Sequence, residues 1–279
     1  MTNRKLNLFW RTPLSRGLFF VFGVCACLSV VAQEKWQKPD FILHAFSEIA
    51  LKNEYSQHDG RLRKWQQPLK IWIDHRVGDR QLHEQLVRWH VDELTRITGH
   101  SVSLVKGPET ANITLVFTRF EDMQRQGREQ LGNNADRVLK GALCLANFKT
   151  NKEQVIYRGQ VVIPVDQARM HGKLVSCVVE ELTQIMGLVN DSSDVYPSIF
   201  NDHTPDDLLS GLDYILLKIL YHKQMQAGMD RDQAVKMART IILQMQKSGE
   251  IESAWKNVSR GELYRLMGFR QLNYSPEGE

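Results

Sequence analysis

The segment VVEELTQIMGLVND, residues 178–191, carries side chains whose types and spacing could do chemistry. If this segment is a helix, Glu180 and Gln184 lie one turn apart and point to the same side. Glu181 is rotated away from them by a single residue. The spacing therefore predicts one carboxylate and one amide in front of the helix, with a second carboxylate beside them.

Gly187 gives the segment a way to turn back on itself. A glycine can adopt a left-handed conformation that ends a helix. The chain beyond it would then bring Asn190 or Asp191 towards the same point as the first two side chains. We therefore expect a site built from carboxylate and amide oxygens.

The offsets 0, 1, 4, 7 and 10 from Glu180 are those of HExxHxxGxxH, the metal-binding helix of many zinc peptidases. In that pattern Glu181 occupies the place of the general base that activates a metal-bound water. The ligand positions hold Glu180, Gln184 and Asn190 in place of histidines. Zinc in hydrolytic sites is usually held by imidazole, so this set should hold zinc poorly.

Three interpretations of the motif stay open. An oxygen set that includes Asp191 would suit a hard divalent cation such as Ca²⁺ better than zinc. A metal-free cluster is also consistent, because amides both donate and accept hydrogen bonds and can satisfy the carboxylates. The third is an ordinary helix that fits the spacing by coincidence. We expect no cofactor, with a divalent cation as the alternative.

The first 32 residues have the pattern of a secretory leader. Four basic residues precede an apolar run, residues 18–32, that is too short to cross a bilayer comfortably and ends in a small residue. We predict a cleaved signal peptide and an exported protein, either periplasmic or bound to the cell envelope. An uncleaved anchor and a lipid anchor at Cys27 are the alternatives, and membrane contact is expected only through them.

Charge excludes one class of partner. The chain has 36 basic and 32 acidic residues, and the leader holds four of the basic ones, which leaves 32 of each sign. Nucleic-acid binding requires clustered surplus cations, so no nucleic-acid partner is expected. The predicted partners are a peptide, glycan or protein of the envelope.

Two cysteines remain after the leader, Cys144 and Cys177. In an oxidising compartment a lone pair favours a disulfide, which would tie the motif helix to the segment around residue 144. Two buried thiols are the alternative.

The remaining pattern predicts an α/β (α+β) fold in which a mixed sheet packs on the motif helix and an all-helical part follows. Asp79 would cap a helix whose buried stripe ends before Gly99, with His83 and His90 solvated on its other side. Residues 120–137 are predicted as a loop with some helix. The predicted strands are 69–75, 101–106, 112–117, 137–148 and 153–165, the motif helix is 167–186, and the predicted stripe residues are Leu82, Leu86, Trp89, Leu94 and Ile97.

The predicted helical end has three start signals. Thr204 with Pro205 would begin a helix over the apolar run LLSGLDYILLKIL, Asp230 would cap a second, and Ser259 with Glu262 would form a capping box for a third. His171 and His203 are expected at the surface. The predicted divisions are a signal peptide over 1–32, an N-terminal helix and linker over 33–68, an α/β part over 69–200 and a helical part over 201–279.

Several segments together resemble DUF2927, an uncharacterised bacterial envelope family some of whose members are described as lipoproteins. These are IALKNEY, RKWQQPLKIWI, SCVVEELTQIMGLVNDS, SIFND and LDYILLKILY. The family is similar to the metzincin-type zincins with substituted ligands. The resemblance implies a zincin-like fold of unknown activity over about residues 40–245.

We expect a protein without ordinary zinc-peptidase activity that binds an envelope component in a polar cleft at the motif. The first alternative is a metallopeptidase-like hydrolase with oxygen ligands and Glu181 as general base. The second is a membrane-tethered structural protein that keeps its leader.

Overall fold

Five segments of alternating apolar residues supply strands of one sheet, as the sequence pattern predicts, and a sixth strand of two residues was not predicted. The computed structural model describes residues 34–52, 60–131, 139, 142–201, 203 and 207–268, all within one compact unit, Gln33–Glu279. The strands are β1 (Lys64–Trp65), β2 (Leu69–His75), β3 (Val102–Val105), β4 (Ile113–Thr118), β5 (Leu145–Thr150) and β6 (Val155–Pro164).

The described strands lie in the order β1-β6-β4-β2-β3, with β5 also paired to β6. Every pairing is parallel except that of β5 with β6, which is antiparallel. The predicted α/β class is therefore correct at the level of a mixed sheet with helices. β5 pairs with β6 alone among the described strands, so it forms an edge of the sheet.

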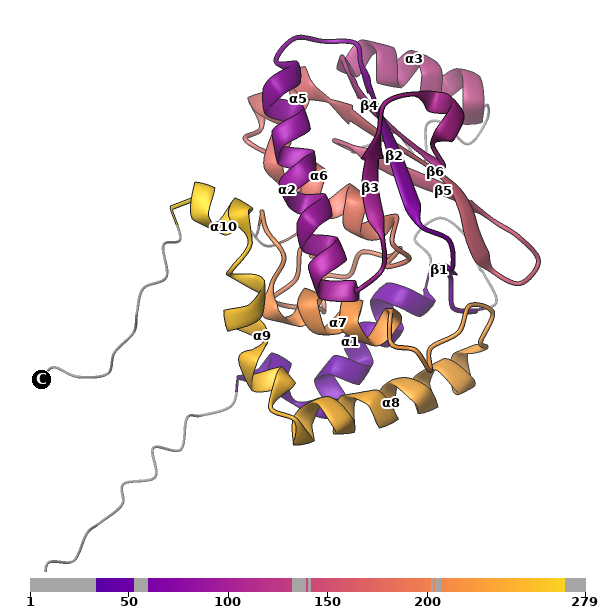
Figure 1. Cartoon of the computed structure of the whole chain (residues 1–279), viewed down its shortest axis with the longest axis vertical. Coiled ribbons are helices and arrows are strands. Elements are labelled where there is room, and N and C mark those ends of the chain that lie inside the picture. Colours follow the sequence, from indigo (N-terminus) through magenta and orange to yellow (C-terminus); the bar gives the residue numbers. More distant parts are fainter. Residues whose placement is uncertain are drawn as a thin grey trace, which may run out of the picture. The chain divides into compact units, whose positions relative to one another are not determined.

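One face of the sheet packs on the main core. Alternate residues such as Ile71, Leu115 and Val161 are at most 1% exposed and belong to the main apolar cluster. Two helices cover this face and contact each other, α2 (Arg80–Thr98) and the motif helix α6 (Leu174–Gln184) (Figure 1). The strand residues that alternate with these core residues point to the opposite face of the sheet, which we call the outer face.

A third helix lies against the C-terminal ends of the parallel strands. This is α3 (Phe120–Leu131), which contacts β6 at the upper end of the sheet in Figure 1. Met123 of α3 and Val116 of the outer face are both buried, yet neither belongs to the main cluster. We conclude that α3 covers this end of the outer face.

The helices α1 (Pro39–Leu51), α7 (Gly211–Leu220), α8 (Arg231–Lys247) and α9 (Glu250–Val258) lie beyond the other end of the sheet (Figure 1). The first helix, α1, packs against α7 and α8. These are followed by α9 and α10 (Glu262–Leu266), and the two short 3-10 turns are η1 (Lys35–Gln37) and η2 (Pro108–Thr110). No helix within the described residues is long and apolar enough to cross a membrane.

The buried stripe of α2 differs from the predicted one. Leu82 is 44% exposed, whereas His83 and His90 are fully buried, so the prediction of two solvated histidines is wrong. His83 stacks on Phe117 of β4 with ring centroids 4.4 Å apart. The helix begins after Asp79, as predicted, but this residue has φ +62° and its side chain does not cap the helix. Gly99 ends α2 in a left-handed conformation, as predicted.

The predicted long motif helix is two helices. α5 (Val165–Met170) ends at His171, Gly172 has a positive φ of +68°, and α6 starts afresh at Leu174. Residues 120–131 form a helix throughout, whereas a loop with some helix was predicted. The apolar run of residues 137–148 supplies a strand only from Leu145 onward.

Helix capping in the C-terminal part agrees with the sequence at one of the two predicted positions that lie within the described residues. Asp230 accepts a hydrogen bond from the Gln233 amide and caps α8, as predicted. Ser259 ends α9 and does not begin α10, which starts after Gly261. The first of these helices starts only at Gly211, capped by Ser210. The predicted start at Thr204 and Pro205 lies outside the described residues, as do the leader and Cys27.

Candidate functional site at the motif helix

A disulfide fixes the motif helix to the edge strand. Cys144 and Cys177 are bonded, with a Cα–Cα distance of 5.9 Å, which confirms the predicted pairing. Cys144 precedes β5 by one residue, and Cys177 lies in α6. Glu180 and Gln184 follow Cys177 by three and seven residues, so all three lie on one face of the helix. This polar face is therefore held beside the edge strand.

The turn at Gly187 brings two of the predicted residues together. Gly187 has φ +118°, and the Gln184 side-chain amide donates a hydrogen bond to Oδ1 of Asp191 over 2.9 Å. Both side chains are half-buried. The chain thus reverses as the sequence predicts, and Asp191 is the residue that returns to the helix face.

Asn190 faces another part of the molecule. Its Nδ2 donates to the Glu48 carbonyl over 3.1 Å and to the Asp191 carbonyl over 2.8 Å. The Val189 and Asn190 amides both donate to the Ile49 carbonyl. Asn190 is only 8% exposed, so it fastens the motif turn to α1 and does not join Gln184.

The two glutamates differ in access to solvent. Glu180 is half-buried, whereas Glu181 is 4% exposed. A general base must reach the water molecule that it activates. The burial of Glu181 therefore favours a structural role over the predicted catalytic one.

The carbonyl groups at the end of the motif helix are satisfied by side chains from distant segments. Trp65 Nε1 donates to the Ile185 carbonyl over 2.7 Å, and the Tyr221 hydroxyl donates to the Met186 carbonyl over 2.8 Å. A Cβ at Gly187 would lie 2.4 Å from the Arg63 carbonyl oxygen. Only glycine fits here, because the position combines a positive φ with this close approach.

A buried hydrogen bond that the sequence did not indicate fixes the middle of the helix. His90 Nε2 of α2 lies 3.0 Å from Thr183 Oγ1, which itself donates to the Val179 carbonyl. The threonine hydrogen is used for the carbonyl, so the imidazole must donate. Burial lowers the pKa of His90 to about 3, which keeps it neutral. No local pattern separates such a histidine from a solvated one.

The donor set at the motif does not fit zinc. The described residues contain no group of three His, Cys, Asp or Glu side chains arranged to hold a metal ion. The amides of Gln184 and Asn190 point their nitrogen atoms at acceptors, and nitrogen atoms of amides are not metal ligands. His171 and His203 are both exposed, and neither lies in this cluster.

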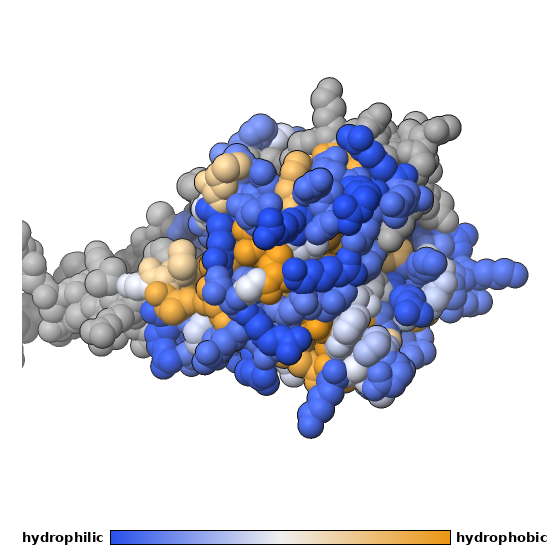
Figure 2. All heavy atoms as spheres, turned by 90° about the horizontal axis from the view of Figure 1, so that it is seen from above, coloured by the Kyte–Doolittle hydropathy of each residue, from blue (hydrophilic) through white to orange (hydrophobic). Residues whose placement is uncertain are grey.

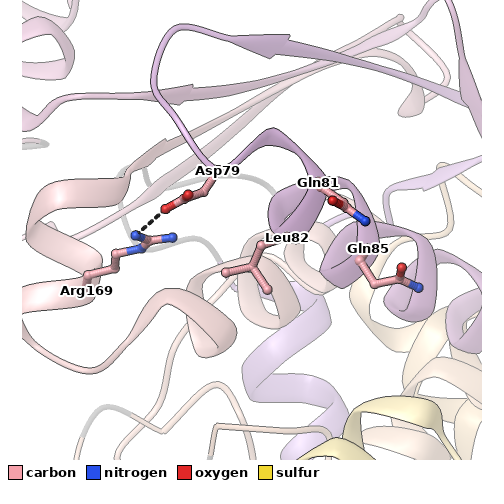
Figure 3. Close-up of a pocket in the computed structure, with 5 residues that line it drawn as sticks. All are labelled: Asp79, Gln81, Leu82, Gln85 and Arg169. Atoms are coloured by element: carbon pink, nitrogen blue, oxygen red, sulfur yellow. Dashed lines mark ion pairs between the residues drawn. The ribbon is translucent and has the colours of Figure 1, made fainter.

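A separate open cavity of about 710 Å³ lies beside the start of α2 (Figure 3). Its lining residues are Asp79, Gln81, Leu82, Gln85 and Arg169. Asp79 and Arg169 form an ion pair of 2.6 Å across it, and both side chains are substantially exposed. Exposed pairs of this kind contribute little to stability. Figure 2 shows the apolar residues of one face as small separate groups among hydrophilic ones.

Comparison with known protein families assigns the chain to a family. A family model described as a protein of unknown function, DUF2927, matches residues 39–240. The chain belongs to the DUF2927 family. The DUF2927 match includes both α1 and the motif helix, the two elements that Asn190 joins. A search of curated proteins found no match to the chain.

Proposed function

We propose that this DUF2927 protein is exported and has a zincin-like fold that binds an extended peptide of the cell envelope without cleaving it. The binding site would lie between the outer edge of β5 and the polar face of α6. One observation carries this proposal: the disulfide Cys144–Cys177 holds the edge strand next to the helix face that bears Glu180 and Gln184.

The edge strand supplies the means of binding. β5 pairs with β6 on one side only among the described strands. An extended peptide can add to such an edge through main-chain hydrogen bonds, and side chains near the edge then give specificity. Here the nearby polar side chains come from the motif helix.

The hydrogen bonds made by the motif residues support binding over hydrolysis. Gln184 and Asp191 are hydrogen-bonded to each other, and Asn190 is bound to the backbone of α1. The zincin-like part of the proposal is supported by the antiparallel edge strand, by the two helices on one sheet face and by the glycine turn after the motif helix.

Peptide binding can be tested with fluorescein-labelled random decapeptides and protein purified from the periplasm. We expect an increase in fluorescence anisotropy for a subset of peptides and no cleavage in mass spectra. Glu180→Gln should weaken binding, whereas Glu84→Gln on α2, whose side chain is 42% exposed, should not.

Metal analysis of the same protein, prepared without chelator, tests the alternative. Stoichiometric metal that disappears together with peptide cleavage in Glu180→Ala would replace our proposal with a metal-dependent hydrolase. N-terminal sequencing should begin near residue 33, and a sequence beginning at Met1 would favour a retained membrane tether.

A further inference from the structure

The outer face of the sheet carries a row of polar side chains next to the end that α3 covers. Strand register aligns Trp72 of β2 with Thr114 of β4, Thr114 with Gln160 of β6, and Gln160 with Asn147 of β5. Residues aligned in this way stand side by side on one face. We call these four residues the polar row.

The hydrogen-bonding groups of the polar row are unused within the described part of the chain. None of the four side chains has a hydrogen-bond partner there, although Trp72, Thr114 and Gln160 are half-buried. Trp72 also lies outside the main apolar cluster, since it points to the opposite face of the sheet. A half-buried aromatic ring beside free amide and hydroxyl groups provides a platform with donors and acceptors.

Three cations border the polar row on the side where β2 and β6 begin and the antiparallel β5 ends. Lys149 of β5 and Arg158 of β6 are directly opposite each other in the register, and both are exposed. Like charges opposite each other destabilise a sheet unless an anion lies between them. Lys70 of β2 lies on the same side of the row, about 14 Å from Lys149 across three strand spacings. None of the three forms an ion pair with a described residue.

The acidic residues near this surface do not cancel its charge. Asp74 lies towards the other end of β2 and is paired with Arg76 at 2.7 Å. Glu109 and Glu153 are in the adjoining turns and are exposed. The charge at the row itself is therefore positive, although the mature chain is balanced overall.

We propose that the polar row and its three cations bind an acidic polysaccharide. The indole of Trp72 would contact the apolar side of a sugar ring. The amides of Gln160 and Asn147 would exchange hydrogen bonds with sugar hydroxyls, which also both donate and accept. Lys149 and Arg158 would bind the carboxylates of the polymer. The polar row presents side chains on the face of the sheet and not the hydrogen-bonding edge of β5, which favours a glycan over an extended peptide.

Titration calorimetry with a polygalacturonate decamer tests this proposal on the periplasmic protein. The double variant Lys149→Gln/Arg158→Gln should bind at least about tenfold more weakly, because it loses charge-assisted hydrogen bonds. Trp72→Ala should weaken the affinity for the decamer by a similar factor, and Trp72→Phe should weaken it less. The matched control is Lys236→Gln/Lys247→Gln, which removes two exposed cations from α8 and should bind as the parent does.

The other outcomes would overturn the proposal. These are absent binding, equal binding of a neutral maltodextrin, and equal weakening by the α8 control. A glutamate decamer that binds as tightly, with no effect of Trp72→Ala, would point to an acidic protein in place of a glycan. Thermal unfolding must show that each variant is folded. Glu180→Gln should leave glycan binding unchanged, which separates this surface from the proposed peptide site.

Discussion

At the scale of single residues, the motif helix depends on buried polar contacts to its neighbours. Thr183 and His90 join α6 to α2, and Asn190 joins the motif turn to α1. Removing Thr183 would leave the buried N–H of His90 without an acceptor, and removing Asn190 would take a donor away from the Glu48 carbonyl. Such orphaned groups cost more than the net value of the original hydrogen bond.

Thr183→Val should therefore destabilise the protein by about 1–3 kcal/mol, because it leaves the imidazole of His90 without its acceptor. Urea unfolding would measure the loss. Ser47→Ala is the matched control: its buried hydroxyl also donates to a carbonyl four residues earlier but has no second partner among the described residues. Its cost should be smaller, about 0.5–1 kcal/mol. Equal losses would show that the contact to His90 contributes nothing.

Gly187→Ala tests the close approach at the motif turn. An added Cβ would meet the Arg63 carbonyl in a backbone conformation unfavourable for alanine. Gly99→Ala separates the two causes, since Gly99 also has a positive φ but nothing within 4 Å of its added Cβ. We expect Gly99→Ala to lower the free energy of unfolding by about 1 kcal/mol and Gly187→Ala to lower it by about 1–3 kcal/mol more. Similar melting temperatures for the two variants would contradict this account.

At the scale of elements, the disulfide is the connection that matters most for the proposed peptide-binding site between β5 and α6. Cys144→Ser/Cys177→Ser should lower the free energy of unfolding by about 3–4 kcal/mol, given a sequence separation of 33. The parent should lose a similar amount in reductant, and the double variant should not respond to it. A parent that is insensitive to reductant would show that the bridge contributes little.

The sequence predicts most elements and part of the site, and the misses have physical reasons. Asp230 begins α8 and Gly99 ends α2, as the local sequence pattern indicates. The stripe of α2 was misplaced because histidine is commonly exposed, whereas His83 packs on Phe117. The reach of Asp191 to Gln184 is a local feature and could be predicted. The partner of Asn190 is 142 residues away in the chain, which no local pattern can reveal.

At the scale of the whole molecule, buried ionisable groups give opposing responses to pH. Burial raises the pKa of Glu93 to about 7, offset in part by Arg96 at 3.2 Å. The stability that protonated Glu93 provides is present below its unfolded pKa, about 4.5, and is lost as pH rises through 7. Burial lowers the pKa of His83 to about 4, so this residue favours the folded state as pH rises from 4 to 6.5.

Glu93→Gln isolates the first of these effects. The variant should match the parent near pH 4.5 and exceed its free energy of unfolding by on the order of 2 kcal/mol at pH 8. Glu84→Gln on the same helix, where the side chain is 42% exposed, serves as the control. Parallel stability curves for Glu93→Gln and the parent from pH 4.5 to 8 would contradict the predicted shift. Urea titrations across this range would provide the measurement.

The attachment of the motif turn to α1 determines where a working fragment can be cut. The amides of Val189 and Asn190 rely on carbonyls of α1, and α1 in turn rests on α7 and α8. A truncated version starting at residue 60 would lose these acceptors together with the helix that covers α8. The family match stops at residue 240, within α8 (Arg231–Lys247). A shortened chain for expression must therefore run from before Pro39 to beyond Lys247, wider than the family boundaries suggest.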